Sequence, residues 1–180
     1  NLERDFEPIG MMASAPFILV VHPSLPARSL KEFVALAKSR PGQMAFASTG
    51  NGSTPHLSME MLKAQAGINL VHVPYKGTPQ AVVDLLSGQV QAMFANTLSV
   101  LPHVKAGRLR ALAISSAKRS GAAPELPTVA ESGMPGYESG TWFGMFAPAG
   151  TPREIISRLN GEINKIVATA EMKSRLVAQG

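Results

Sequence analysis

Residues 48–56 carry the residue types in this chain that are best suited to holding a ligand. Gly50 and Gly52 let the backbone approach a ligand closely, and a helix is expected to begin just after them. The first amides of a helix lack internal partners and lie at the positive end of its dipole, so they attract anions. The segment therefore predicts a carboxylate site that needs no lysine or arginine. The alternative is a plain turn in which Thr54 caps a helix that starts at Pro55.

Polar side chains also follow the next two apolar runs. Residues 70–73 lead to Tyr75 and Lys76 at another expected helix start. Residues 92–95 lead to an amide and a hydroxyl, those of Asn96 and Thr97. If the strand before the glycines lies between these two strands, all three loops line one edge of the sheet. Such an edge would suit a phosphate, a carboxylate or another oxyanion. Taken singly, Tyr75 is a half-buried ring with a satisfied hydroxyl, Lys76 a solvated ammonium, and Asn96 a turn former. The predicted ligand-binding residues are Ser48, Thr49, Gly50, Asn51, Gly52, Ser53, Thr54, His56, Tyr75, Lys76, Gly77, Thr78 and Asn96.

Residue types that perform catalysis are sparse or badly spaced. The chain has no cysteine, its four histidines are far apart in sequence, and none of the apolar runs ends in Asp or Glu. His56 is interpreted as a hydrogen-bonding residue of the first helical turn rather than a base. The glycine segment lacks the lysine of a phosphate-binding P-loop and the third glycine of a dinucleotide fingerprint. We therefore expect no metal, no cofactor and no enzymatic activity.

Composition narrows the classes of protein further. The 180 residues are 45% hydrophobic and 16% charged, and no apolar run approaches the roughly 20 residues that cross a bilayer, so we expect no membrane insertion. The net charge of +5 is scattered rather than interleaved with aromatic residues, so no nucleic acid is expected as a partner. A mild positive potential favours the arrival of small anions. The lack of cysteine is compatible with the periplasm.

Alternation of short apolar runs with amphipathic segments predicts an α/β fold with a parallel sheet covered on both faces. A capping box at Ser29 and Glu32 opens the first helix of the series. Thr151 is expected to cap a later helix with Pro152 as its first residue. The expected strands are residues 17–21, 44–47, 70–73, 92–95, 110–114 and 141–147; the expected helices are residues 30–37, 55–65, 79–86, 98–105, 152–169 and 172–178, with a long loop at 115–139 that holds one turn at 128–132.

Several longer motifs, in order along the chain, resemble one family. They are residues 47–53 with His56 and Leu57, then 71–77, 85–90, 101–113, 127–133 and 148–152. These segments are similar to the motifs of Bug-type periplasmic solute receptors, the substrate-binding components of tripartite tricarboxylate transporters. The resemblance covers essentially the whole chain.

The resemblance implies one lobe of a type II periplasmic binding protein, a two-lobed clamshell that closes on a small organic carboxylate. The ligand would be a dicarboxylate, or a tricarboxylate or related aromatic acid, delivered to membrane permease subunits from the periplasm. Residues 1–19 would be partial first lobe and crossover, 20–113 the second lobe, 114–140 a loop and return segment, and 141–180 a crossover with partial first-lobe helices. The first lobe would be incomplete, because family members begin with an export signal and a Pro-Gly-Gly type loop and continue beyond Gly180.

One departure from the family pattern bears on the ligand. Relatives often carry Asp-Asn where this chain has Ala95 and Asn96. The alanine removes a carboxylate that would pair with a ligand ammonium, which favours a plain dicarboxylate over an amino acid. Two other functions stay open from the sequence. One is the ligand-sensing effector domain of a transcription regulator. The other is a phosphate-handling transferase, in which the glycine segment would bind the phosphate and activity would depend on the positive charge of Lys76.

Overall fold

The computed structural model describes residues 1–179, which form two compact units. Unit 1 comprises Asn1–Ala15 and Thr141–Gln179, and unit 2 comprises Pro16–Gly140. Gly180, the last residue of the segment expected at 141–180, lies outside the described residues. The assignment of these units to the lobes of a longer receptor stays a prediction.

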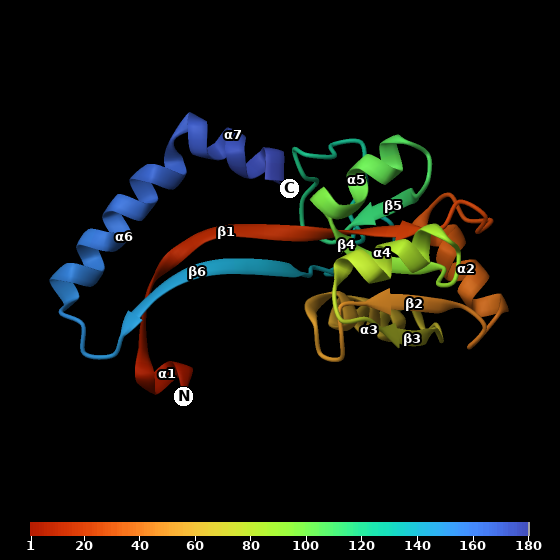
Figure 1. The fold of residues 1–180 in the computed structure, drawn as a ribbon, viewed down its shortest axis with the longest axis horizontal. Coiled ribbons are helices and arrows are strands. Elements are labelled where there is room, and N and C mark those ends of the chain that lie inside the picture. Colours follow the sequence, from red (N-terminus) through yellow and green to blue (C-terminus); the bar gives the residue numbers. More distant parts are fainter. Residues whose placement is uncertain (180) are drawn as a thin grey trace. The chain divides into compact units, whose positions relative to one another are not determined.

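The sheet of unit 2 has the strand order β3-β2-β4-β1-β5 (Figure 1). Its strands are β1 (Phe6–Val21), β2 (Ala45–Ser48), β3 (Val71–Pro74), β4 (Ala92–Asn96) and β5 (Arg110–Ile114). β2 pairs in parallel with both β3 and β4, as expected for strands joined by helical crossovers. The α/β class predicted from the alternating pattern is confirmed.

The expectation of an all-parallel sheet is wrong for β1. This strand runs antiparallel to both of its neighbours, β4 and β5, with Phe17 opposite Asn96 and Ile18 opposite Ile114. A continuous apolar run reports burial on both faces and is identical for either strand direction, so periodicity could not reveal the reversal. β1 also begins at Phe6, well before the predicted start at residue 17. The prediction was too short because Pro8, Gly10 and Pro16 interrupt the sequence pattern, although they do not end the strand.

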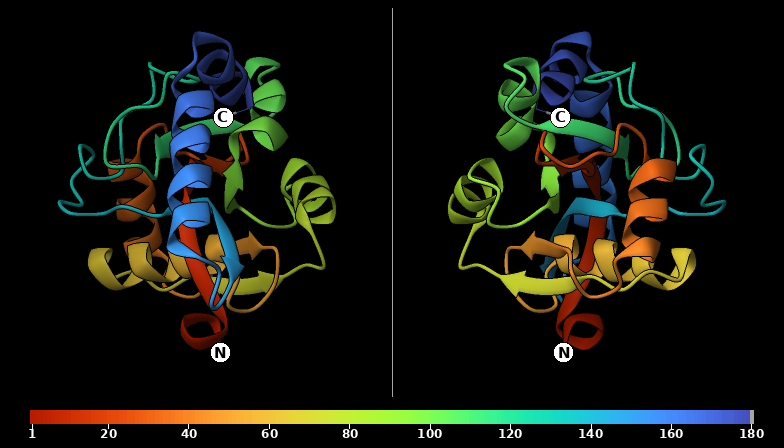
Figure 2. Two further views of the ribbon diagram at one scale, coloured as in Figure 1. Left: turned by 90° about the vertical axis from the view of Figure 1, so that its left-hand side faces the viewer. Right: turned by 90° about the vertical axis from the view of Figure 1, so that its right-hand side faces the viewer.

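Helices cover both faces of the unit 2 sheet (Figure 2). α2 (Leu30–Ser39) and α3 (Thr54–Ala66) pack on one face, in a cluster that includes Phe33, Leu62 and Phe46. α4 (Thr78–Leu86) and α5 (Thr97–Lys105) pack on the other face, where Leu85 and Val100 meet alternate residues of the same strands. The strands are therefore held between two apolar layers.

The ends of two helices follow the sequence expectation. Ser29 accepts a hydrogen bond from the Glu32 amide at 3.2 Å, and the Glu32 carboxylate accepts from the Arg28 amide at 2.7 Å. α3 ends at Gly67, whose φ of 63° is the left-handed conformation that favours glycine. In the 115–139 loop, the expected turn is hydrogen-bonded, with the Glu131 amide donating to Thr128 Oγ1 at 3.0 Å.

Unit 1 holds α1 (Leu2–Asp5), β6 (Gly140–Pro148), α6 (Arg153–Ala168) and α7 (Ala170–Gln179), and β6 pairs with β1. The side-chain amide of Asn160 in α6 donates from Nδ2 to the Ile9 carbonyl of β1 at 2.7 Å. A Cβ on Gly10 would lie 2.9 Å from that same side-chain nitrogen, so any other residue there would require the Asn160 side chain to move. Thr151 is not the cap that the sequence predicts. Its hydroxyl donates to the Pro148 carbonyl, and the helix is capped one residue later at Pro152.

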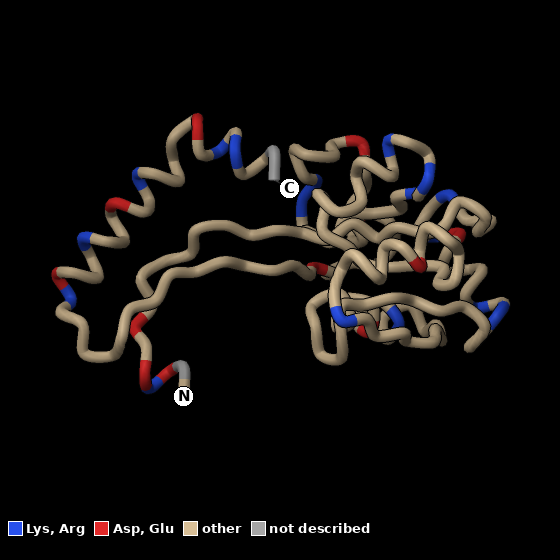
Figure 3. The backbone as a smooth tube through the Cα atoms, in the orientation of Figure 1, with Lys and Arg blue, Asp and Glu red and all other residues tan. Residues whose placement is uncertain are grey.

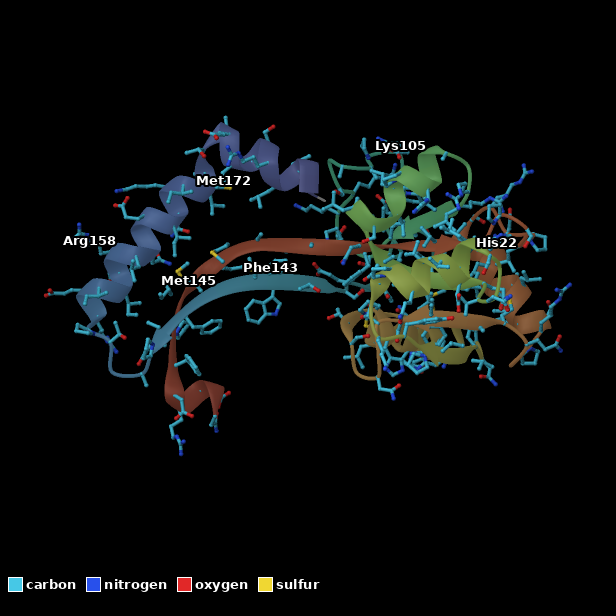
Figure 4. All side chains as sticks on the ribbon, in the orientation of Figure 1. His22, Lys105, Phe143, Met145, Arg158 and Met172 are labelled. Atoms are coloured by element: carbon cyan, nitrogen blue, oxygen red, sulfur yellow. The ribbon has the colours of Figure 1, made fainter. Side chains whose placement is uncertain are left out.

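Large apolar side chains of unit 1 are exposed. Trp142 is 60% exposed and Phe143 51%, and Figure 4 shows the Phe143 and Met145 side chains on β6. Ile9 and Ala147 are the buried hydrophobic residues of this unit among those the structure describes. Across residues 1–179, no helix combines the length and the apolar character that spanning a membrane requires.

Candidate functional site

The three predicted loops leave the same edge of the sheet of unit 2. β2 lies between β3 and β4, with Ser48 level with Pro74 and Ala47 level with Met93. Since these three strands are parallel, their carboxyl ends and the loops that follow lie together. The strand order on which the sequence argument depended is therefore the one observed.

The first loop, residues 48–56, is called the glycine loop here. Gly50 has a φ of 126° and Gly52 a φ of 75°, so both glycines occupy backbone conformations that other residues rarely adopt. The Ser53 amide and the Ser53 hydroxyl both donate to the Gly50 carbonyl, at 3.2 and 2.7 Å. The interpretation of Thr54 as a cap is wrong: Ser53 occupies the N-cap position of α3 without a side-chain cap, because its hydroxyl is bonded inside the loop.

Several backbone amides of the glycine loop have no hydrogen-bond partner among residues 1–179. The Leu57 amide is the first of α3 to bond back, to the Ser53 carbonyl at 3.0 Å. The amides without a partner in the described part of the chain are those of Thr49, Asn51, Thr54 and His56. Such amides at a helix start are the donors from which proteins build anion sites. The loop can therefore offer several N–H groups to one carboxylate.

The hydroxyls of the loop divide into two groups. Ser48 is fully buried, and its Oγ lies 3.1 Å from both the amide and the carbonyl of Gly50 and 2.6 Å from His72 Nε2. The Ser53 hydroxyl is likewise consumed within the loop. Thr49 and Thr54 are half-buried, and within the described structure their hydroxyls make no hydrogen bond. The serines therefore shape the loop, whereas the threonine hydroxyls remain open to a ligand.

His56 makes the first-turn hydrogen bond that its position suggests. Its Nδ1 accepts from the Gly52 amide at 3.1 Å, and its ring stacks on His72 with centroids 3.9 Å apart. Burial, followed by the neighbouring charge of His56, lowers the pKa of His72, and Lys63 acts in the same direction while Glu60 opposes it. Hydrogen bonding and stacking by these two imidazoles therefore stabilise the glycine loop.

The second loop is tied to the first. The Tyr75 amide donates to the Ser48 carbonyl at 3.0 Å, and the Tyr75 hydroxyl donates to Asp84 at 2.7 Å. Burial, together with the Asp84 carboxylate, raises the pKa of Tyr75 to about 12. The simpler interpretation of Tyr75, a half-buried ring with a satisfied hydroxyl, is the one observed. A groove of about 460 Å³ on α4 is lined by Tyr75, Pro79, Gln80, Val83 and Asp84 and does not include the glycine loop.

Lys76, Gly77 and Thr78 complete this loop. Lys76 is exposed and forms no ion pair with any described residue. Gly77 is the N-cap of α4, with an extended backbone, and within residues 1–179 the amides of Thr78 and Gln80 have no partner. A second helix start therefore points unpaired amides at the edge where the glycine loop lies. Basic side chains are otherwise spread along the chain (Figure 3).

The third loop contributes Asn96 and Thr97, of which only Asn96 was among the predicted ligand-binding residues. Asn96 is exposed and is the N-cap of α5 without a side-chain cap. The next residue, Thr97, is only 3% exposed, and its Oγ1 is the one buried side-chain polar atom in the described structure without a hydrogen-bond partner. Its place directly after a strand and at a helix start was the available signal. No group of three or more metal-ligating side chains gathers anywhere in residues 1–179.

Comparison with known proteins identifies the family. The family model described as the tripartite tricarboxylate transporter family receptor matches residues 1–180. The chain belongs to this receptor family. The resemblance that the sequence motifs indicated is thereby confirmed.

Relatives within the receptor family include proteins with bound carboxylates. Protein BugT of Bordetella pertussis is 42% identical over 177 residues, covering 98% of this chain and 54% of its own length. The structure of R. palustris Rpa4515 with adipate superposes with a TM-score of 0.87 at 36% identity, covering 100% of this chain and 60% of that one. MatC from Rhodopseudomonas palustris with bound malate gives a TM-score of 0.79 at 30% identity, covering 97% and 60%. The chain spans about half the length of the curated relatives it matches.

Proposed function

We propose that the protein is the ligand-binding part of a periplasmic receptor that binds a small organic dicarboxylate without chemically altering it. The receptor would hand this ligand to the membrane permease subunits of a tripartite tricarboxylate transporter. A tricarboxylate or a related aromatic acid is the wider class of candidate ligand. The unpaired amides of the glycine loop are the single observation that carries this proposal.

The chemistry of the loop supports a carboxylate over a phosphate ester. The glycine loop offers amides and neutral hydroxyls, and Lys76 of the second loop is exposed and paired with no described residue. Charge-assisted hydrogen bonds of this kind each contribute about 1.5 to 3 kcal/mol, so a few of them suffice for micromolar affinity when water is excluded. The adipate and malate bound by the two Rhodopseudomonas relatives belong to the same ligand class.

The same proposal assigns the two units of the chain to the two lobes of a receptor. Unit 2 would be the second lobe of a clamshell, and unit 1 part of the first lobe, with the ligand enclosed when the lobes close. The site residues proposed to contact the carboxylate directly are Thr49, Gly50, Asn51, Gly52 and Thr54, with Lys76, Gly77, Thr78 and Asn96 along the flanks. Ser48, Ser53, His56 and Tyr75 would hold these groups in place.

A thermal-shift screen of this chain tests the function. Succinate, adipate and malate are compared with butyrate and inorganic phosphate, since a ligand that binds the folded state raises the melting temperature with concentration. The proposal requires a saturable rise with at least one dicarboxylate and a smaller one with butyrate. A rise with phosphate alone would favour the transferase, and a flat response to all five compounds would contradict the proposal.

A further inference from the structure

Three aromatic rings stack beside the glycine loop. Phe46 of β2, His72 of β3 and His56 of α3 form a column, with centroids 4.8 Å apart for the first pair and 3.9 Å for the second. The planes of the two imidazoles differ by 16°, and Phe46 is fully buried at the base of the column. The sheet and α3 thereby fix where both imidazoles lie.

Each imidazole holds one of the two left-handed glycines of the loop. His56 Nδ1 accepts directly from the Gly52 amide at 3.1 Å. His72 acts through a hydroxyl: its Nε2 lies 2.6 Å from Ser48 Oγ, which accepts from the Gly50 amide at 3.1 Å. These bonds fix the two backbone conformations that point the free amides outward.

The protonation state of His56 decides whether its bond to the Gly52 amide survives. A ring nitrogen accepts a hydrogen bond only when it carries no proton, so an imidazolium at position 56 cannot accept from Gly52. Two charged rings 3.9 Å apart would also repel each other. Glu60 and Lys63 of α3 are the other charged groups facing the pair. The Glu60 carboxylate lies 3.8 Å from His56 Nε2 and is already paired with Lys63 at 2.6 Å.

We propose that His56 and His72 are positioning residues for the glycine loop: as a neutral stacked pair they hold Gly50 and Gly52 in the binding conformation, and protonation loosens the loop and weakens carboxylate binding. This inference rests on the proposed function for its ligand but on the described geometry for its mechanism. It assigns a role to the side chains of two histidines, which are not proposed to contact the ligand themselves.

The variants separate hydrogen bonding from titration. His56→Asn places an amide oxygen near the position of Nδ1, and His72→Gln places an amide group near Nε2, so this double variant keeps both hydrogen bonds and cannot be protonated. The double variant His56→Phe with His72→Phe keeps the stacked rings and loses these hydrogen bonds. His103→Asn, at a half-buried position of α5, is the control for loss of a histidine elsewhere.

The affinity for adipate is measured by calorimetry at about pH 8 and about pH 5.5, on either side of the imidazole range. Protonation of adipate itself affects every protein equally, so the ratio between wild type and variant isolates the pair. Affinity of the wild type should fall about tenfold more on acidification than that of the Asn/Gln variant. The His103→Asn protein should follow the wild type, and the Phe/Phe variant should bind weakly at both pH values. Equal pH profiles for wild type and the Asn/Gln variant, or tighter wild-type binding at low pH, would overturn the proposal.

A ligand-free measurement keeps the inference separate from the proposed function. In nuclear magnetic resonance spectra of the unliganded chain, the Gly50 and Gly52 amide signals should shift as the pH falls, and these amides should lose protection against exchange with water relative to the intrinsic exchange rate at each pH. The Asn/Gln variant should show no such change. If these amides respond while no carboxylate binds, the positioning role stands and the proposed ligand is wrong. If they do not respond in the wild type, the positioning role is refuted, whatever the ligand.

Discussion

The backbone amide of Tyr75 donates to the carbonyl oxygen of Ser48 at 3.0 Å, so the start of the second loop is hydrogen-bonded to the last residue of β2. Ser48 in turn contacts both backbone groups of Gly50 and the ring of His72. The two loops therefore form one hydrogen-bonded body rather than two independent segments. A change in either loop is expected to alter the free amides of both.

Gly50→Ala is expected to impair binding through the backbone. Its φ of 126° is a conformation that costs other residues about 1 to 3 kcal/mol, whereas the added Cβ would meet only the Tyr75 carbonyl at an ordinary 3.8 Å. Chemical denaturation should show this loss of stability, and calorimetry a loss of dicarboxylate affinity. Gly107→Ala, at a φ of 70° with open space around it, is the matched control. It should lower stability without changing affinity, and equal affinity losses in both variants would contradict the assignment.

Thr54→Val tests a hydroxyl that has no partner among residues 1–179. Valine keeps the branched shape and removes one donor to a bound carboxylate, so affinity should fall about tenfold, in line with one charge-assisted hydrogen bond. Thr54→Ser keeps the hydroxyl and should bind within about threefold of wild type. Calorimetric titration with malate measures both. Unchanged binding by the valine variant would remove Thr54 from the site.

Thr97→Val is expected to stabilise the unliganded protein. The Thr97 hydroxyl is buried without a partner within the described structure, and such a group costs about 1 to 3 kcal/mol that valine does not incur. The midpoint of urea unfolding should therefore rise. Val100→Thr, at a fully buried position of the same helix, is the reverse change and should lower it. A valine variant less stable than wild type would mean that the hydroxyl has a partner.

Both tyrosines are expected to ionise only at a pH above the ordinary tyrosine pKa. Burial is the first cause for each, and it raises the pKa of Tyr75 and of Tyr137 to about 12. A raised pKa favours the protonated phenol in the folded state, so this stability is present below the unfolded value of about 10 and is lost as the pH rises from there to about 12. The chain has two tyrosines, so the tyrosinate absorbance reports them alone. A tyrosine that titrates near its ordinary value in the folded chain would disagree with this burial.

Local sequence signals predicted the elements more reliably than their arrangement. The Ser29 capping box and the Gly67 cap depend on residues within one turn, and both were found. The direction of β1 depends on partners about 80 residues away, with Phe17 opposite Asn96, and no local pattern encodes it. The cap of α6 was misplaced by one residue because the Pro148 carbonyl competes for the Thr151 hydroxyl.

The candidate site likewise combines features that local sequence predicts with features that depend on tertiary contacts. Residue types alone indicated the glycine loop, since paired glycines before a helix start suit an anion site, but they left a plain turn open as the alternative. That Ser48 would turn inward could not be foreseen, because its partner His72 reaches it only through the pairing of β2 with β3. The burial of the Thr97 hydroxyl without a partner could not be predicted, because it is a tertiary property.

The central claim, that unpaired amides of the glycine loop bind a carboxylate, is tested most directly by mapping adipate binding onto the isotopically labelled chain by nuclear magnetic resonance. This method detects weak binding and reports each amide separately. The account predicts saturable shifts that are largest at the amides of Thr49, Asn51, Thr54 and His56, with smaller ones at Thr78 and Gln80. Shifts that are absent from these amides, or that follow the exposed lysines and arginines instead, would contradict it.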